Sequence, residues 1–295
     1  MSSYNLSNSK LLPHLLEIIQ ALQEILGDQA YDFLLIGASA RDLIMDTIYD
    51  LGINRATEDV DFAVYVPEWG AYESILQKLV DSEIFQPTKV THKLLFKSRY
   101  EVDIVPFGDI QNPEGHYTWP PDHIKAMNVA GFMEVSAGGI NIQSDATKFR
   151  TASIPGICIM KLLAWQDRGF QDNRDGKDLG FILSNYVKMK YEDLYILHED
   201  LMEDENFDRV VTTARIMGRD IFDRLKANPI ALEQIKNILC KETEDEDYSR
   251  LALSLKDGGA IQYSIAYKSL KAMIQGLEDK RSPASDELNK SIRPC

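Results

Sequence analysis

The hydrophobic and polar residues near the start of the chain predict a helix, a strand and a second helix in close succession. Apolar residues recur at helical spacing over residues 9–26, and Gly27 then ends the pattern. The run FLLI at 33–36 is too short for a lone helix and is typical of a buried strand. It stops at Gly37, after which small residues lead into an amphipathic pattern over roughly residues 41–49. We therefore expect a strand, a tight turn and a helix here.

Strand signals dominate the region that follows, up to about residue 150. Short runs with an alternating pattern are bounded there by glycine, proline and polar residues. They predict a strand at 60–66, a helix at 69–80, a hairpin of 93–96 with 100–107, an ordered loop at 111–122, and a second hairpin at 132–142 that turns at Gly138-Gly139.

The pattern changes at residue 154, from which long helical periodicities with charged faces take over. We therefore expect an α/β (α+β) protein with two domains. Residues 1–153 would form a short mixed sheet flanked by helices, and residues 154–295 a mostly helical domain.

Charge and composition narrow the classes of function. The chain has 295 residues, of which 44% are hydrophobic, so we expect a globular protein. Its formal net charge of −14 divides into −10 over residues 1–150 and −4 over residues 151–295. An acidic surface argues against sequence-independent coating of nucleic acid, which requires a basic one. A local basic pocket stays open, and we expect it in the less acidic half.

The cysteines and the hydropathy favour a cytoplasmic protein. Cys158, Cys240 and Cys295 are widely spaced and form no CxxC motif, which suits a reducing compartment. No uncharged apolar run approaches the ~20 residues of a membrane span. The start, MSSYNLSNSK, lacks the apolar stretch of a signal peptide.

Three aspartates carry the candidate chemistry. Asp59 and Asp61 flank the start of the strand predicted at 60–66, and side chains two apart face the same way. Asp103 lies in the alternating run EVDIV, on the face opposite Val102 and Ile104. If the two strands are neighbours, these carboxylates meet and require divalent cations for neutralisation. Oxygen ligands without a Cys or His cluster favour magnesium or manganese, and two ions would hold a triphosphate.

Each feature alone also has an ordinary structural explanation. An Asp-x-Asp pair is commonly a turn or a cap, Gly37 simply ends a strand, and Asp103 is a solvent-facing strand residue. The aromatic residues His116, Tyr117 and Trp119 form either a wall for a base or a pin that fixes a loop to the core. The fixed order of glycine turn, acid pair and later acid is more selective than its parts, and it favours a nucleotide site.

This order of motifs resembles the nucleotidyltransferase superfamily of the DNA polymerase beta type. The run GASARDLIMD is similar to the GGxVRDLLLG opening of CCA-adding enzymes and poly(A) polymerases. The run RATEDVDF, followed by a helical second half, is most similar to bacterial AbiEii-type nucleotidyltransferases. These are the toxin side of some toxin–antitoxin and phage-defence systems. The resemblance covers roughly residues 31–186 and implies a nucleotidyltransferase fold.

The resemblance also implies roles for residues of the first half. Gly37 and Ser39 would contact the β- and γ-phosphates of a nucleotide, while Asp59, Asp61 and Asp103 would bind metal. The family places its second Gly or Ser directly after the first Gly, whereas here Ala38 intervenes, so which residue contacts phosphate stays open and we select Ser39. Arg41 and Asp42 match the Arg-Asp pair of the CCA-adding opening, and a salt bridge at the helix start explains them equally well. Arg55 and Thr57 would brace the metal loop.

In the second half the resemblance extends to the segment MKLLAWQDRGFQDNRDGKDLGFIL. Lys161 matches a family lysine and would contact a nucleotide phosphate, while Asp178 matches a later aspartate. Asp175 and Lys177 are weaker candidates for the same positions. The structural alternatives are a lysine that extends along a helix edge for Lys161, and a helix cap or an interdomain salt bridge for Asp178.

We therefore expect a metal-dependent enzyme that moves a nucleoside monophosphate from an NTP to a hydroxyl acceptor. The family likeness implies tRNA or other RNA as the acceptor and an antitoxin protein as a partner. A nucleotide- or partner-binding protein without turnover is the alternative of another class. An antibiotic-modifying adenylyltransferase would share the same site and differ only in its acceptor pocket.

Overall fold

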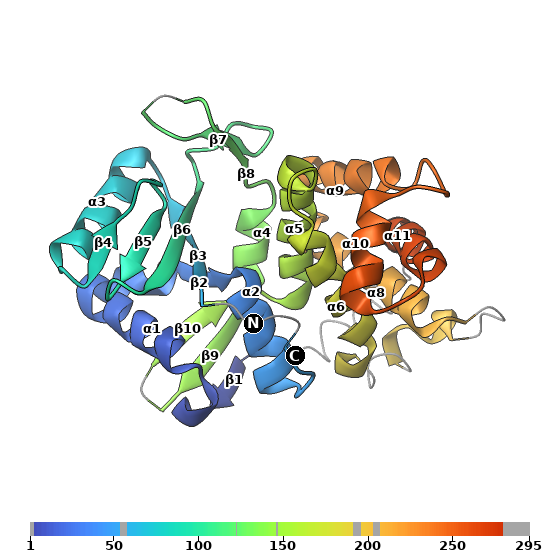
Figure 1. Cartoon of the computed structure of the whole chain (residues 1–295), viewed down its shortest axis with the longest axis horizontal. Coiled ribbons are helices and arrows are strands. Elements are labelled where there is room, and N and C mark those ends of the chain that lie inside the picture. The colour runs from blue at the N-terminus through green and yellow to red at the C-terminus, as the bar shows by residue number, and fades with distance from the viewer. Residues whose placement is uncertain are drawn as a thin grey trace. The chain divides into compact units, whose positions relative to one another are not determined.

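The computed structural model describes residues 3–53, 58–121, 123–145, 147–190, 196–202 and 207–279. These residues form two compact units (Figure 1). The first unit holds residues up to 123 together with 132–157, and the second holds residues 124–131 together with those from 158 onward. The combination of a mixed sheet with many helices confirms the α/β (α+β) prediction.

One mixed sheet with the order β1-β9-β10-β2-β3-β6-β5-β4 forms the body of the first unit. The pairs β3–β6, β10–β2 and β1–β9 are parallel, and the others are antiparallel. The strands are β1 Ser3–Leu6, β2 Phe33–Ile36, β3 Val60–Val66, β4 Phe85–Pro87, β5 Lys93–Phe96, β6 Tyr100–Gly108, β9 Ile140–Ser144 and β10 Lys148–Thr151, with the short β7 His116–Thr118 in a loop.

The strands β2, β3 and β6 form the centre of this sheet. All four residues of β2 are buried, as is typical of a strand covered on both faces. In β6 the side chains of Val102 and Ile104 are fully buried, while Asp103 between them retains some exposure. Asp103 therefore lies on the face opposite its two neighbours, as the alternating pattern predicts.

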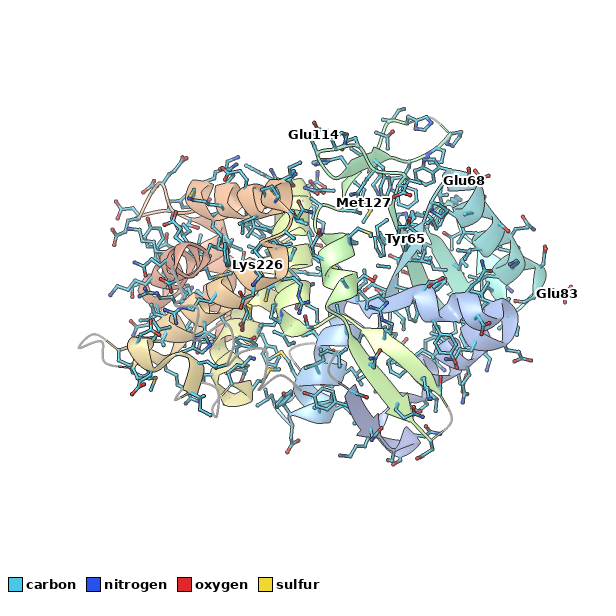
Figure 2. The ribbon with its side chains drawn as sticks, turned by 180° about the vertical axis from the view of Figure 1, so that it is seen from behind. Tyr65, Glu68, Glu83, Glu114, Met127 and Lys226 are labelled. Carbon is cyan, nitrogen blue, oxygen red and sulfur yellow. The ribbon has the colours of Figure 1, made fainter. Side chains whose placement is uncertain are left out.

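Helices cover the sheet of the first unit. Pro13 occupies the first turn of α1, and Gly27, with φ of 58°, ends that helix as predicted. Helix α3 ends at Asp81 and is followed by a left-handed residue, Glu83 (Figure 2), whose N–H donates to the Val80 carbonyl at 3.0 Å. The helices are α1 Pro13–Leu26, α2 Gly37–Asp42, α3 Trp69–Asp81 and α4 Phe132–Ala137, with the π-helix η3 Leu43–Ile48 and the 3-10 helices η1 Asn8–Lys10 and η2 Gly27–Asp32.

Two details of the first unit differ from the sequence prediction. Helix α2 begins at Gly37 itself, with no separate turn before it, and runs on into η3. The hairpin predicted at 132–142 is wrong, because 132–137 form α4 and β9 pairs instead with β10. Phe132 and Val135, three residues apart, are both buried, which matches one helix face. Gly139 lies where a Cβ would approach Leu34 Cδ1 to 2.9 Å, so this glycine permits close packing and does not turn a hairpin.

The second unit is helical, which confirms the prediction of long helices after residue 154. Its elements are β8 Ala126–Asn128, α5 Ile154–Arg168, α6 Arg174–Met189, η4 Glu199–Leu201, α8 Arg209–Leu225, α9 Pro229–Lys241, α10 Arg250–Gly259 and α11 Tyr263–Glu278, with the first residues of α5 in the first unit. A Cβ at Gly258 of α10 would overlap the Lys177 carbonyl oxygen of α6, so glycine lets these helices approach closely. No helix in the described part of the chain has the length and apolar character needed to cross a membrane.

Candidate functional site

Two of the three candidate aspartates lie directly opposite each other on neighbouring strands. Asp61 of β3 is paired in register with Asp103 of the parallel strand β6. Residues in register on adjacent strands direct their side chains to the same face of the sheet. The sequence predicted this meeting only on the condition that the two strands are neighbours, and the sheet order fulfils that condition.

Gly37 brings the start of α2 against this acid pair. Ile36, the last residue of β2, is paired with Asp61, so the chain enters α2 beside the carboxylate. Gly37 has φ of 70°, a conformation that residues with a Cβ rarely adopt. A Cβ built there would overlap Oδ2 of Asp61. The glycine is therefore required both by the backbone conformation and by the space that Asp61 occupies.

Ser39 connects the same helix to the third aspartate. Its side chain is buried, and Oγ donates a hydrogen bond to the main-chain carbonyl of Asp59 at 2.9 Å. This bond fixes the segment just before β3 to the first turn of α2. Ser39 thus has a structural role in the nucleotide-free protein, and its contact with a phosphate stays a prediction.

Asp103 lies in an environment that disfavours its charged form. Burial raises the pKa of its carboxyl above the usual range, and the nearby charges of Glu101 and Asp59 add to the increase. The ammonium of Lys93, 3.3 Å from Oδ1 of Asp103, offsets part of this increase. A cation that binds this carboxylate would therefore stabilise its charged form.

Sequence analysis did not single out Lys93 or Glu101. The hairpin of β5 and β6 is symmetric about Ser98, which pairs Lys93 with Asp103. The ammonium of Lys93 also forms a short ion pair with Glu101. The predicted hairpin contained the signal, since counting outward from its turn already places Lys93 opposite Asp103.

The oxygen donors of this site fit a magnesium or manganese ion that is completed by a substrate. Within the described ranges, no three His, Cys, Asp or Glu side chains are close enough to hold a metal by themselves. Mg²⁺ in nucleotide enzymes is commonly held by one or two carboxylates together with phosphates and water. The aligned Asp61 and Asp103 are such a pair, and Oδ1 of Asp103 is buried near the Lys93 ammonium. Asp59 would add a carboxylate at the same end of β3.

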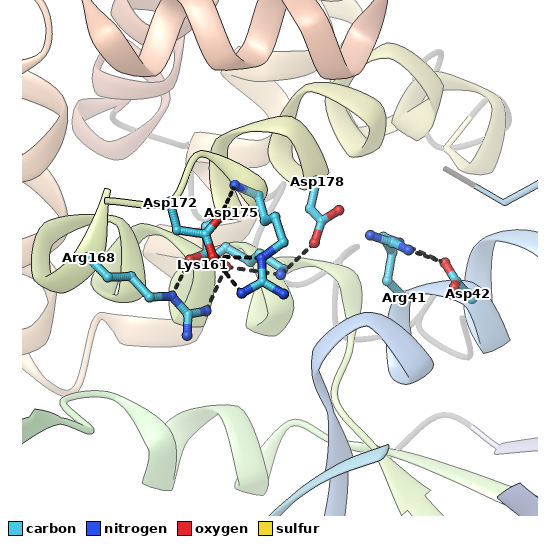
Figure 3. A network of polar contacts seen from close by, with 8 residues as sticks. Arg41, Asp42, Lys161, Arg168, Asp172, Asp175 and Asp178 are labelled. Carbon is cyan, nitrogen blue, oxygen red and sulfur yellow. Dashed lines mark hydrogen bonds and ion pairs between the residues drawn. The ribbon is translucent and has the colours of Figure 1, made fainter. Parts of the chain in front are cut away.

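Arg41 and Asp42 form an ion pair with each other in α2 (Figure 3). The Arg41 guanidinium lies 2.7 Å from Asp42 Oδ1 through Nε and 2.6 Å through Nη2. Both side chains are buried. The salt bridge that we considered for this pair is therefore present, while a contact of Arg41 with a nucleotide stays a prediction.

The candidates of the second unit form a buried network of opposite charges (Figure 3). Lys161 of α5 lies 2.6 Å from Oδ2 of Asp178 and 3.1 Å from Oδ1 of Asp175, both on α6. Arg168 donates to both oxygens of Asp175, at 2.7 and 3.0 Å. Burial alone would raise the pKa of Asp175, but the hydrogen bonds and charges of Arg168 and Lys161 outweigh it and lower the pKa. Lys177 lies on the same helix.

Asp178 forms a salt bridge in this network, but with Lys161 of the same unit and not between the two units as the alternative for Asp178 had it. Lys161 is buried with its ammonium between two carboxylates, unlike a lysine that extends into solvent from a helix edge. Its contact with a nucleotide phosphate stays a prediction, and so does any catalytic role of Asp178. Arg55 and Thr57 lie outside the described residues.

The aromatic residues of the loop between β6 and β8 fix that loop to the core of the first unit. Tyr117 and Trp119 are buried and pack on Trp69 of α3, with ring centroids 5.3 and 5.9 Å away. Trp119 also stacks on His92 at 4.8 Å. Tyr117 and Trp119 thus fix the loop to the core, while a contact of this cluster with a base stays a prediction.

The sheet presents two aligned aspartates beside a glycine at a helix start, which is the arrangement expected from the predicted resemblance to nucleotidyltransferases. A family described as the nucleotidyl transferase AbiEii toxin of a type IV toxin–antitoxin system matches residues 20–268. The match covers most of the chain, which therefore belongs to the AbiEii family. The predicted resemblance is thus confirmed. Neither the curated proteins nor the solved structures searched include a match to this chain.

Proposed function

We propose that this protein transfers a nucleoside monophosphate from an NTP to a hydroxyl group, with a divalent cation at Asp61 and Asp103. The observation that carries the proposal is the register of these two aspartates, together with the space for Asp61 that only a glycine at position 37 leaves. Membership of a nucleotidyl transferase family supports the class of reaction. Two carboxylates that face each other repel, and a divalent cation between them would relieve that repulsion.

Each residue of the site would have a distinct task. The backbone N–H groups at the start of α2, from Gly37 to Ser39, would bind the β- and γ-phosphates, because the first N–H groups of a helix have no partner within it. Asp59, Asp61 and Asp103 would hold the cations. When bound, the cations supply charge neutralisation of the triphosphate and a lower pKa for the attacking hydroxyl.

The reaction would be an in-line displacement at the α-phosphorus. The acceptor oxygen forms a new bond to this phosphorus while the bond to the bridging oxygen breaks and pyrophosphate leaves. Asp103 would accept the proton of the attacking hydroxyl. Charged side chains and backbone dipoles that are already in place lower the barrier without reorganisation.

We propose RNA, in particular tRNA, as the acceptor and an antitoxin protein as the partner. Support comes from the family, whose description places it in toxin–antitoxin systems. The net charge of −14 makes wide electrostatic contact with RNA unfavourable. We therefore expect recognition of a short RNA end by a local site and weak dependence of the affinity on salt.

A transfer assay tests this function directly. The protein is incubated with each of the four NTPs, labelled at the α-phosphate, and with separate pools of tRNA, protein and small hydroxyl compounds. We expect label in one pool, with Mg²⁺ or Mn²⁺ required and EDTA abolishing it. Asp59→Asn, which removes a proposed metal ligand, serves as the reference variant with reduced transfer. Label in the small-molecule pool alone would replace RNA as the acceptor, and tight NTP binding without label in any pool would refute transfer.

Replacement of Gly37 by Ala should separate backbone strain from displacement of Asp61. The left-handed backbone at this position should cost about 1–2 kcal/mol of stability in Gly37→Ala. The new Cβ must also displace the Asp61 carboxylate, so transfer should fall by roughly a hundredfold. Denaturant unfolding and the transfer assay measure the two effects.

Gly52→Ala is the matched control for this variant. Gly52 has φ of 80°, but a Cβ there meets nothing within 4 Å. It should reproduce the loss of stability and leave transfer unchanged. Equal activity of the Gly37 and Gly52 variants would mean that Asp61 needs no space at this turn.

A further inference from the structure

Lys93 lies in one row with the two aligned aspartates across three neighbouring strands. Asp103 of β6 is paired with Asp61 of β3 on one side and with Lys93 of β5 on the other. All three side chains therefore face the same side of the sheet. A resident positive charge thus stands beside the carboxylate pair to which we assign the cation.

The ammonium of Lys93 is shared between two carboxylates. Asp103 and Glu101 are two residues apart on β6, so their side chains lie on the same face. Lys93 Nζ is 3.3 Å from Asp103 Oδ1 and forms a much shorter ion pair with Glu101. The exposed fraction of the Glu101 side chain is 44%, against 22% for Asp103. Lys93 therefore has a more exposed partner, Glu101, as well as a less exposed one, Asp103.

We propose that Lys93 is the internal counter-ion of Asp103 in the metal-free protein and that Glu101 retains Lys93 when a divalent cation binds. The inference deepens the proposed function, on which it rests. Lys93 would be a positioning residue, which holds the Asp103 carboxylate in place without touching substrate. Glu101 would be the second carboxylate partner, with which the Lys93 ammonium stays paired after the metal displaces it from Asp103.

The physical reason is competition between two cations for one carboxylate. An ammonium and a divalent cation near the same oxygen repel each other, so metal binding must move Lys93 away from Oδ1. A lysine suits this exchange, because it is a compact point charge on a flexible stem. With the Glu101 contact already formed, the ammonium needs only to give up the longer contact to Asp103. Without Lys93 the buried carboxylate would lack this compensating charge before the metal arrives.

The test measures Mn²⁺ affinity by electron paramagnetic resonance at one pH and ionic strength, in the presence of a saturating non-hydrolysable NTP analogue, because the phosphates are expected to complete the metal site. In Lys93→Met the competing ammonium is gone, so Mn²⁺ should bind about tenfold more tightly. In Glu101→Gln the ammonium loses its second carboxylate partner and stays on Asp103, so Mn²⁺ should bind about fivefold more weakly. A role in folding alone would weaken binding in both variants, whereas this mechanism gives opposite signs.

The double variant Lys93→Met/Glu101→Gln distinguishes the mechanism from simple attraction between Glu101 and the metal. If Glu101 acts through Lys93, its replacement has no further effect once Lys93 is absent. Lys93→Arg keeps the charge and should bind Mn²⁺ within threefold of wild type. Lys97→Met controls for loss of a positive charge in general. Lys97 lies on the same hairpin as Lys93 and pairs with Glu17 of α1, and its replacement should change the Mn²⁺ affinity less than twofold.

A second measurement is thermal unfolding, recorded without and with Mn²⁺. Thermal unfolding of metal-free Lys93→Met should have a lower midpoint than wild type, because Asp103 has lost its counter-ion, and Mn²⁺ should raise this midpoint more than it does in wild type.

Weaker or unchanged Mn²⁺ binding in Lys93→Met, or an equal effect of Glu101→Gln with and without Lys93, overturns the inference. If wild type binds Mn²⁺, Asp61→Asn does not, and the Lys93 variants behave as wild type, only the inference on Lys93 fails. If wild type binds no Mn²⁺ even with NTP present, both it and the proposed metal site fail.

Discussion

Asp61→Asn should reduce nucleotide transfer by roughly a thousandfold or more and leave the fold intact. The amide has the shape of the carboxylate, so it fits the space beside Gly37, but it carries no charge to hold a cation. Loss of one of two facing carboxylate ligands removes several kcal/mol of stabilisation from the transition state, and about 1.4 kcal/mol corresponds to a tenfold change in rate. The measurement is the initial rate of transfer at saturating NTP and Mg²⁺.

The same variant should keep or slightly increase the stability of the metal-free protein. Asp61 and Asp103 face each other, and neutralisation of one removes repulsion between like charges. Circular dichroism during thermal unfolding measures this. A clear loss of stability would mean that the lost activity reports on folding and not on chemistry.

Asp109→Asn is the matched control for Asp61→Asn. Asp109 is an exposed carboxylate just past the end of β6 that accepts a hydrogen bond from Tyr65 (Figure 2 labels Tyr65) at 3.1 Å. The Asp109→Asn variant makes the same chemical change as Asp61→Asn in the same unit, away from Asp61 and Asp103. We expect wild-type rates from it. Rates for Asp61→Asn within threefold of those for Asp109→Asn would exclude Asp61 from the reaction.

Lys161→Met should destabilise the protein by about 3–5 kcal/mol, the range found when one partner of a buried ion pair is removed. Lys161 lies between Asp178 and Asp175, which are 0% and 1% exposed in their side chains. Methionine preserves most of the volume, so the loss reports on the charge and not on a cavity. Asp175 keeps Arg168 as a partner, whereas Asp178 loses an ammonium at 2.6 Å. Chemical denaturation with extrapolation to water gives the free energy of unfolding.

Two further variants test this explanation. Lys161→Met/Asp178→Asn removes both charges and should recover part of the stability, since the buried carboxylate that lost the Lys161 ammonium is then neutral. Lys236→Met removes one partner of an exposed ion pair with Glu278 and should leave the free energy of unfolding unchanged within error. A loss in Lys161→Met no greater than in Lys236→Met would show that the buried pair contributes little. A loss of transfer in Lys161→Met under conditions where it stays folded would support the predicted phosphate contact.

Local patterns predicted those elements whose signals lie within a few residues of each other. The buried run of β2, the alternation of β3 and the hairpin of β5 and β6 needed only a strand period and a turn. The long helices of the second unit, such as α5, needed only helical spacing. The acid motifs were also visible, because an Asp-x-Asp pair at a strand start is a local feature.

The errors and omissions share a physical cause, which is pairing between distant segments. The edge strand β1 went unpredicted because its partner β9 lies more than a hundred residues away. The short segment that forms α4 was assigned to a hairpin because a glycine pair in sequence resembles a turn. Packing against Leu34 decided the role of Gly139, and this contact appears only in the folded chain.

The sequence by itself determined which candidate groups this protein contains, namely a glycine at a helix start, an Asp-x-Asp pair, a later Asp103 and a helical second half. These features also indicated the family to which the protein belongs. Only the tertiary structure decided which of these groups meet. It placed Asp61 opposite Asp103 and Lys161 between two carboxylates of α6. The reason is that strand register and helix packing are set by hydrogen bonds and burial between residues far apart in the chain, which no local pattern encodes.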